Sequence, residues 1–87
     1  LGYLTRRKRY IDRIRIKKIF MQVIRSDIYL REAVSYIIPD KYNIFYVLDT
    51  NSRIIGIVTE IQLLDIFFGL EKKDIEMSQV LQYYKIK

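Results

Sequence analysis

The chain has 87 residues, and its 51% hydrophobic content fits one small folded domain rather than a disordered segment. It contains neither cysteine nor histidine, which excludes disulfides, thiolate metal sites and imidazole acid–base catalysis and favours a protein that is not an enzyme. The net charge of +6 is concentrated at the N-terminus, where residues 1–25 carry nine Lys and Arg residues against the single acid Asp12.

Residues 1–16 are interpreted as a basic arm ahead of the folded domain. Apolar side chains recur in the arm at helical spacing, which favours an amphipathic helix over about residues 3–14. Three interpretations of the charge stay open: a linker helix, a contact with an anionic membrane surface, and a contact with nucleic-acid phosphates. No nucleic-acid-binding motif accompanies the basic residues, so nucleic acid is the least favoured partner.

The next elements expected are a strand over Ile19–Ile24 and a helix that follows it. Ser26 and Asp27 can cap this helix, because their side-chain oxygens accept hydrogen bonds from free backbone N–H groups. Apolar residues then recur at i, i+3, i+4, i+7 and i+8, and Pro39 ends the helical pattern. The members of this apolar stripe are Leu30, Ala33, Val34, Ile37 and Ile38.

Two stretches rich in β-forming residues, Tyr42–Asp49 and Ile54–Thr59, are separated by a short turn over residues 50–53. So short a connection predicts an antiparallel hairpin. Both stretches are nearly continuously apolar, so both faces of the hairpin are expected to be covered.

Thr59 and Gln62 match the capping-box pattern at the start of a further helix, which Gly69 is placed to end. The pattern puts Leu63, Leu64, Phe67 and Phe68 on one side of that helix. A last helix over residues 77–84, capped by Ser78, follows a charged joint. The order strand–helix–strand–strand–helix indicates the α/β (α+β) class, a small sheet packed on two helices with N- and C-terminal helical extensions.

The segments Val47–Asp49 and Ile54–Thr59, with the upstream segment Val23–Ala33, together resemble the CBS (cystathionine beta-synthase) domain family. The resemblance covers residues 17–70 as a single CBS motif of a Bateman-type module. Residues 71–87 are a C-terminal extension, within which Glu76–Leu81 is similar to the lead-in of a second CBS motif.

The resemblance implies a regulatory domain that pairs with a second CBS motif and modulates a parent enzyme or transporter. It also implies an adenosine-containing ligand such as AMP, ATP or S-adenosylmethionine. Adenine would pack against Ile24, Phe45 and Tyr46, and Thr59 would contact phosphate or ribose. Gln62 stands where the family often has an Asp that holds the ribose hydroxyls, and a capping box alone also accounts for Thr59 and Gln62.

Large apolar side chains occupy more than one face of the helix that begins near Thr59, and one small sheet cannot cover them all. We therefore expect a homodimer, or pairing with another CBS motif, through these side chains. Two functions stay open, a regulatory sensor and a ligand-free structural dimerisation domain. The lack of cysteine favours a cytoplasmic location, either free or as the cytoplasmic part of a membrane protein. The predicted interface residues are Ile61, Leu64, Phe67 and Phe68.

Overall fold

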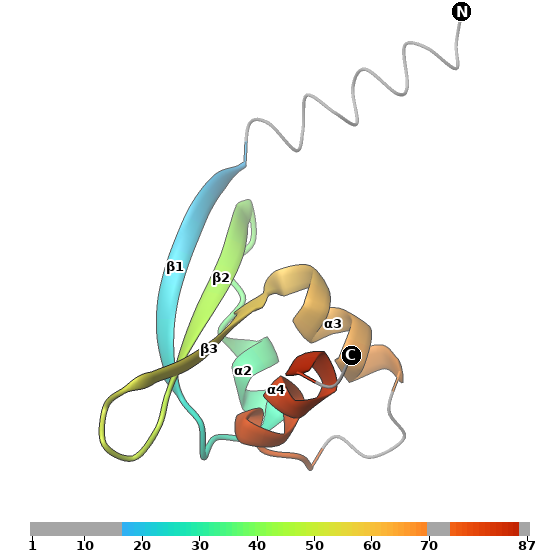
Figure 1. Ribbon diagram of the computed structural model, residues 1–87. Coiled ribbons are helices and arrows are strands. Elements are labelled where there is room, and N and C mark those ends of the chain that lie inside the picture. The colour runs from blue at the N-terminus through green and yellow to red at the C-terminus, as the bar shows by residue number, and fades with distance from the viewer. Residues whose placement is uncertain (1–16, 70–73, 86–87) are drawn as a thin grey trace, which may run out of the picture.

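The computed structural model describes residues 17–69 and 74–85, which form a small α+β domain with a three-stranded mixed sheet and three helices (Figure 1). The predicted basic arm, residues 1–16, lies outside the described residues. The elements are β1 (Lys18–Arg25), α2 (Leu30–Ser35), β2 (Lys41–Leu48), β3 (Ile54–Thr59), α3 (Glu60–Gly69) and α4 (Met77–Lys85).

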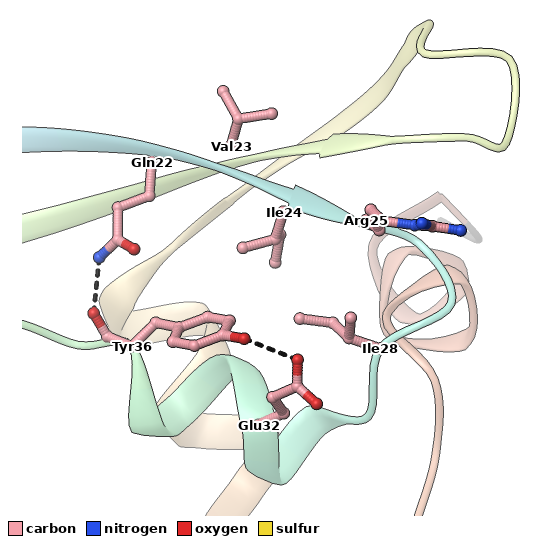
Figure 2. Close-up of a pocket in the computed structure, with 7 residues that line it drawn as sticks. All are labelled: Gln22, Val23, Ile24, Arg25, Ile28, Glu32 and Tyr36. Carbon is pink, nitrogen blue, oxygen red and sulfur yellow. Dashed lines mark hydrogen bonds between the residues drawn. The ribbon is translucent and has the colours of Figure 1, made fainter.

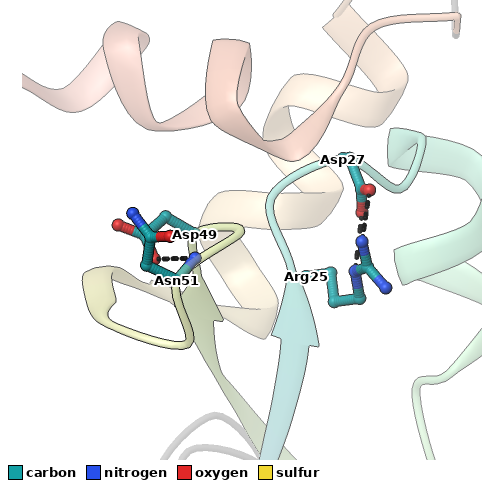
Figure 3. Close-up of polar contacts among 4 residues, drawn as sticks. All are labelled: Arg25, Asp27, Asp49 and Asn51. Atoms are coloured by element: carbon teal, nitrogen blue, oxygen red, sulfur yellow. Dashed lines mark hydrogen bonds and ion pairs between the residues drawn. The ribbon is translucent and has the colours of Figure 1, made fainter.

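The sheet has the strand order β1-β2-β3, with β1 parallel to β2 and β2 antiparallel to β3. The predicted hairpin is therefore confirmed. Its loop is closed by Asp49, whose Oδ1 accepts a hydrogen bond from the backbone N–H of Asn51 at 2.8 Å (Figure 3). The same oxygen accepts from the backbone N–H of Arg53 at 2.9 Å. Ser52 takes the left-handed backbone conformation that the turn requires, with φ of 62°.

All three helices lie on one face of the sheet (Figure 1). Every second residue of β2 points to that face and is buried: Asn43, Phe45 and Val47. The helices add apolar side chains from the opposite side, so one core lies between the sheet and the helices. Its members are Ile24, Leu30, Ala33, Phe45, Val47, Val58, Leu63, Ile66, Met77, Val80 and Leu81.

A buried amide organises the end of the core where β2 begins. The side chain of Asn43 is fully buried, and its Nδ2 donates to Oε1 of Glu60 at 2.7 Å and to the carbonyl of Ile38 at 3.0 Å. Its Oδ1 accepts from the N–H of Ile38 at 3.1 Å and from Nε2 of Gln22 at 3.1 Å. The amide thus joins β1, the loop after α2 and the first residue of α3.

The helix α2 differs from its prediction at both ends. Its N-cap is Tyr29, without a side-chain capping bond, so the expected cap at Ser26 and Asp27 is wrong. Asp27 instead forms an ion pair with Arg25 at 2.8 Å, in the turn that leaves β1 (Figure 3). The helix also ends at Ser35, before the last two positions of the predicted apolar stripe, Ile37 and Ile38.

The C-terminal segment is part of the core rather than an appendage. Backbone hydrogen bonds join it to the turn before α2: Leu30 N–H donates to the carbonyl of Ile75 at 2.8 Å, and Met77 N–H to that of Ile28 at 2.9 Å. The predicted helix is present, but the expected cap by Ser78 is wrong. Ser78 lies inside α4, and the side chain of Gln79 accepts a bond from the N–H of Glu76 at 2.9 Å.

The α3 prediction is correct at both ends, since the helix runs from the predicted capping box to Gly69. Thr59 Oγ1 accepts from the N–H of Gln62 at 3.2 Å, and Gln62 Oε1 accepts from the N–H of Thr59 at 3.0 Å, which is the predicted capping box. Leu63 and Ile66 face the core, whereas Phe68 is 75% exposed.

Candidate interaction surface

The face of the sheet opposite the helices is open among the described residues, and we call it the open face. In β1 it presents the odd-numbered residues, which the register places beside the even-numbered residues of β2. Val23, for example, lies beside Tyr46, which lies beside Ile57 of β3. The apolar side chains of the open face are Ile19, Met21, Val23, Tyr42, Ile44, Tyr46, Leu48, Ile54 and Ile57.

The open face overturns the expectation that both faces of the hairpin are covered within the part of the chain described. Val23 is 63% exposed and Ile57 is 53% exposed, and Ile19, Met21 and Ile54 are also more than half exposed. The cause is that α2, α3 and α4 all pack on the other face. A strand that is apolar on both faces is typical of a sheet covered on both sides. The open face would therefore be expected to have a cover, which residues 17–69 and 74–85 do not supply.

The chemistry of the open face favours contact with another apolar surface. Between the strand ends it carries no charged side chain, and Arg25, at the C-terminal end of β1, is paired with Asp27. The open face measures roughly 26 Å along the strands and roughly 14 Å across them. A patch of this size is comparable to the largest apolar patch of a typical monomer, which is often functional.

The sequence predicted these side chains as strand residues, and of them it assigned only Tyr46 to a predicted site. The residue pattern of β1 does indicate such an apolar surface. A half-buried strand alternates apolar and polar residues, whereas Ile19, Met21 and Val23 are apolar at the positions that alternation would leave to solvent.

The predicted ligand residues do not share one cleft. Ile24 and Phe45 point to the helix side of the sheet, where Phe45 is fully buried, and Tyr46 points to the open face. Thr59 and Gln62 are brought together, and each engages the other through the capping box. The sheet thus separates Ile24 and Phe45 from Tyr46.

The predicted interface residues lie on α3. Ile61 is 59% exposed and Phe68 is also exposed, whereas Leu64 and Phe67 are half-buried. The ring of Phe68 packs edge-on against that of Phe67, with centroids 5.4 Å apart. The helix therefore presents a narrower apolar strip than the open face does, because its inner side is filled by the core.

A hollow of about 390 Å³ lies between β1 and α2. Figure 2 shows Gln22 and Ile24 pointing from β1 toward α2, while Val23 points away. The hydroxyl of Tyr36 donates to Oε2 of Glu32 at 2.7 Å, and this hydrogen bond, together with desolvation and the carboxylate charge, raises the pKa of the Tyr36 phenol. The lining residues are Gln22, Val23, Ile24, Arg25, Ile28, Glu32 and Tyr36.

Searches against protein-family models, curated proteins and solved structures find no match for this chain. Among residues 17–69 and 74–85, no helix has the length and apolar character that crossing a membrane requires. The same ranges hold no group of acidic side chains arranged to bind a metal ion.

Proposed function

We propose that this chain is a CBS-type assembly domain that pairs with a second copy of itself through the open face of its sheet. The observation that carries the proposal is the open face, an uncharged surface of large apolar side chains on strands whose other face is already packed. In a parent protein, such pairing would hold subunits together and pass a conformational bias between them.

Self-pairing is favoured because the open face carries, between its strand ends, no charge that would repel its own copy. Two such faces can stack at the usual separation of about 10 Å, with their side chains interdigitated. Covering the exposed parts of Ile19, Met21, Val23, Ile54 and Ile57 is worth on the order of 5 kcal/mol before the entropic cost of association.

Of the two functions suggested by the resemblance, ligand-free assembly fits the described residues better than nucleotide sensing. Phe45 is fully buried, so its ring offers no surface to an adenine. Thr59 and Gln62 already satisfy each other in the capping box. Tyr46 remains half-buried on the open face, where it would contact a second copy.

The test is the oligomeric state of the full 87-residue chain carrying Ile57→Glu, measured by sedimentation velocity over a range of concentrations. Ile57 lies on the open face in the edge strand β3, beside Tyr46 of the central strand, so a carboxylate there would be buried without a partner in the pair. We expect the dissociation constant to rise at least tenfold, which corresponds to a loss of roughly 1.4 kcal/mol or more of association free energy.

The matched control is Ile61→Glu on α3, which makes the same substitution at a similarly exposed isoleucine. Association that weakens with Ile57→Glu and not with Ile61→Glu supports pairing through the open face. The reverse pattern would move the contact to the α3 strip, and a wild-type chain that stays monomeric at millimolar concentration would remove the proposal.

A further inference from the structure

The outer edge of β1 is a second surface with an unusual property. In the strand order β1-β2-β3, no strand among residues 17–69 and 74–85 pairs with the side of β1 that faces away from β2 (Figure 1). Proteins normally protect such an edge with proline, a bulge or charged side chains near its middle. The segment Ile19–Ile24 has none of these, because the only charged residues of β1 are those at its two ends, Lys18 and Arg25.

The backbone groups that point outward can be identified from the bonding pattern. Ser26 N–H donates to the carbonyl of Leu48 at 2.7 Å, so residue 26 directs its backbone groups toward β2. Backbone groups alternate in direction along a strand. The even-numbered residues of β1 therefore bond to β2, and Ile19, Met21 and Val23 present their N–H and C=O groups at the free edge.

There is room beside this edge. The hollow between β1 and α2 is lined by Val23 and Ile24 of β1, by Glu32 of α2 and by Tyr36, which follows α2 (Figure 2). The helix α2 thus does not close over the outer side of β1. A strand added at this edge would direct alternate side chains into the hollow, toward the Glu32 carboxylate.

We infer that β1 also pairs in antiparallel fashion with β1 of a second copy, about a two-fold axis at Met21. In this register Met21 bonds to Met21 of the other copy, and Ile19 bonds to Val23 in both directions. All of the outward groups identified above are then satisfied, and the two sheets become one continuous sheet. The arrangement is self-complementary, as a two-fold contact requires.

The register also brings opposite charges together. It places Lys18 of the second copy opposite Ile24, at about 4.5 Å between Cα atoms, because even-numbered residues occupy the non-hydrogen-bonded positions. Lys18 has the same side-chain direction as Ile24, toward α2, so its ammonium group can reach the carboxylate of Glu32. The two-fold axis repeats this contact, giving two Lys18–Glu32 pairs per dimer.

This edge contact is separate from pairing through the open face. It uses backbone groups of β1 and side chains that point toward α2, whereas the proposed function uses side chains that point the other way. One chain can make both contacts at once. The Ile57→Glu variant weakens only the face contact, so it provides a background in which edge pairing is measured alone.

Charge exchange tests the Lys18–Glu32 contact. In the full chain carrying Ile57→Glu, we expect Lys18→Glu and Glu32→Lys each to raise the dissociation constant at least about tenfold in sedimentation velocity. An equimolar mixture of the two variants should associate as the parent does, because both pairs then join opposite charges. Arg53→Glu is the matched control for the change in net charge made by Lys18→Glu, and it should leave association unaffected.

Backbone pairing is tested independently by amide hydrogen exchange of the wild-type chain, measured by NMR at high and low concentration. The amides of Ile19, Met21 and Val23 should gain protection on association, whereas those of Gln22 and Ile24 should be protected at both concentrations. Equal exchange of the odd-numbered amides at both concentrations would overturn the inference, as would charge variants that associate like the parent.

Discussion

At the scale of single residues, the domain depends on a few polar side chains with definite partners. Asn43 is the clearest case, because a fully buried amide is tolerated only when its donors and acceptors are bonded. The sequence showed only an asparagine within an apolar strand, and its partners Glu60 and Gln22 are distant in the chain. Asp49 shows the same limit: it contributed to the CBS resemblance, and the structure gives its carboxylate a loop-closing role.

Replacing Asn43 by alanine should destabilise the fold by about 2 to 3 kcal/mol, because the buried groups that it bonds lose their partner. The free energy of unfolding in urea measures this directly. Asn51→Ala is the control, since Asn51 bonds to Asp49 through its backbone N–H and its side chain is exposed, so we expect a change within about 0.5 kcal/mol. Equal effects at the two positions would contradict the role given to Asn43.

The Tyr36–Glu32 contact predicts a pH dependence at alkaline pH. The hydrogen bond to Glu32 raises the pKa of the Tyr36 phenol above its ordinary value of 10.0. Its stabilising effect is therefore fully present below pH 10.0 and is lost as the pH rises through the raised value. Glu32→Gln should lower the Tyr36 pKa, observed by NMR titration of the ring carbon signals. A Tyr36 pKa that does not change in this variant would contradict the assigned cause.

At the scale of elements, the sequence predicted what local patterns determine and missed what depends on distant segments. The hairpin, the α3 capping box and the existence of every described helix follow from spacing and turn residues. The cap expected at Ser26 and Asp27 failed because the first N–H group of α2, that of Leu30, donates instead to the carbonyl of Ile75 in the segment leading into α4, at 2.8 Å. A contact between segments so far apart leaves no local signal.

The packing of α4 on β3 predicts a specific requirement for glycine. A Cβ atom added at Gly56 would lie 2.5 Å from Cδ2 of Leu81, which is itself in the core. Gly56→Ala should therefore destabilise the domain by about 1 to 3 kcal/mol through overpacking, measured by thermal or urea unfolding.

Gly69 is the natural control for that experiment. It ends α3, and a Cβ added there meets nothing within 4 Å. Gly69→Ala should leave stability unchanged or raise it slightly, since alanine favours the helical backbone. A destabilisation by Gly69→Ala as large as that by Gly56→Ala would show that the close approach of Leu81 is not the cause.

At the scale of the whole molecule, the sequence composition and the fold point to the same conclusion. The strands are apolar on both faces, and the described helices cover only one of them. The sequence predicted excess apolar surface but assigned it to α3, because helical patterns show their faces more clearly than continuously apolar strands do. In the fold, most of that apolar surface lies on the sheet, where Val23 and Ile57 are exposed.

The most direct test of this account is the solvent exposure of the open face in solution. It is measured by the attenuation of methyl NMR signals with a soluble paramagnetic agent at a concentration where the chain associates. If a second copy covers the sheet, the methyl signals of Met21, Val23 and Ile57 will be attenuated no more than that of the buried Ile24. Attenuation of these three signals in proportion to their exposure in the single chain would contradict the central claim.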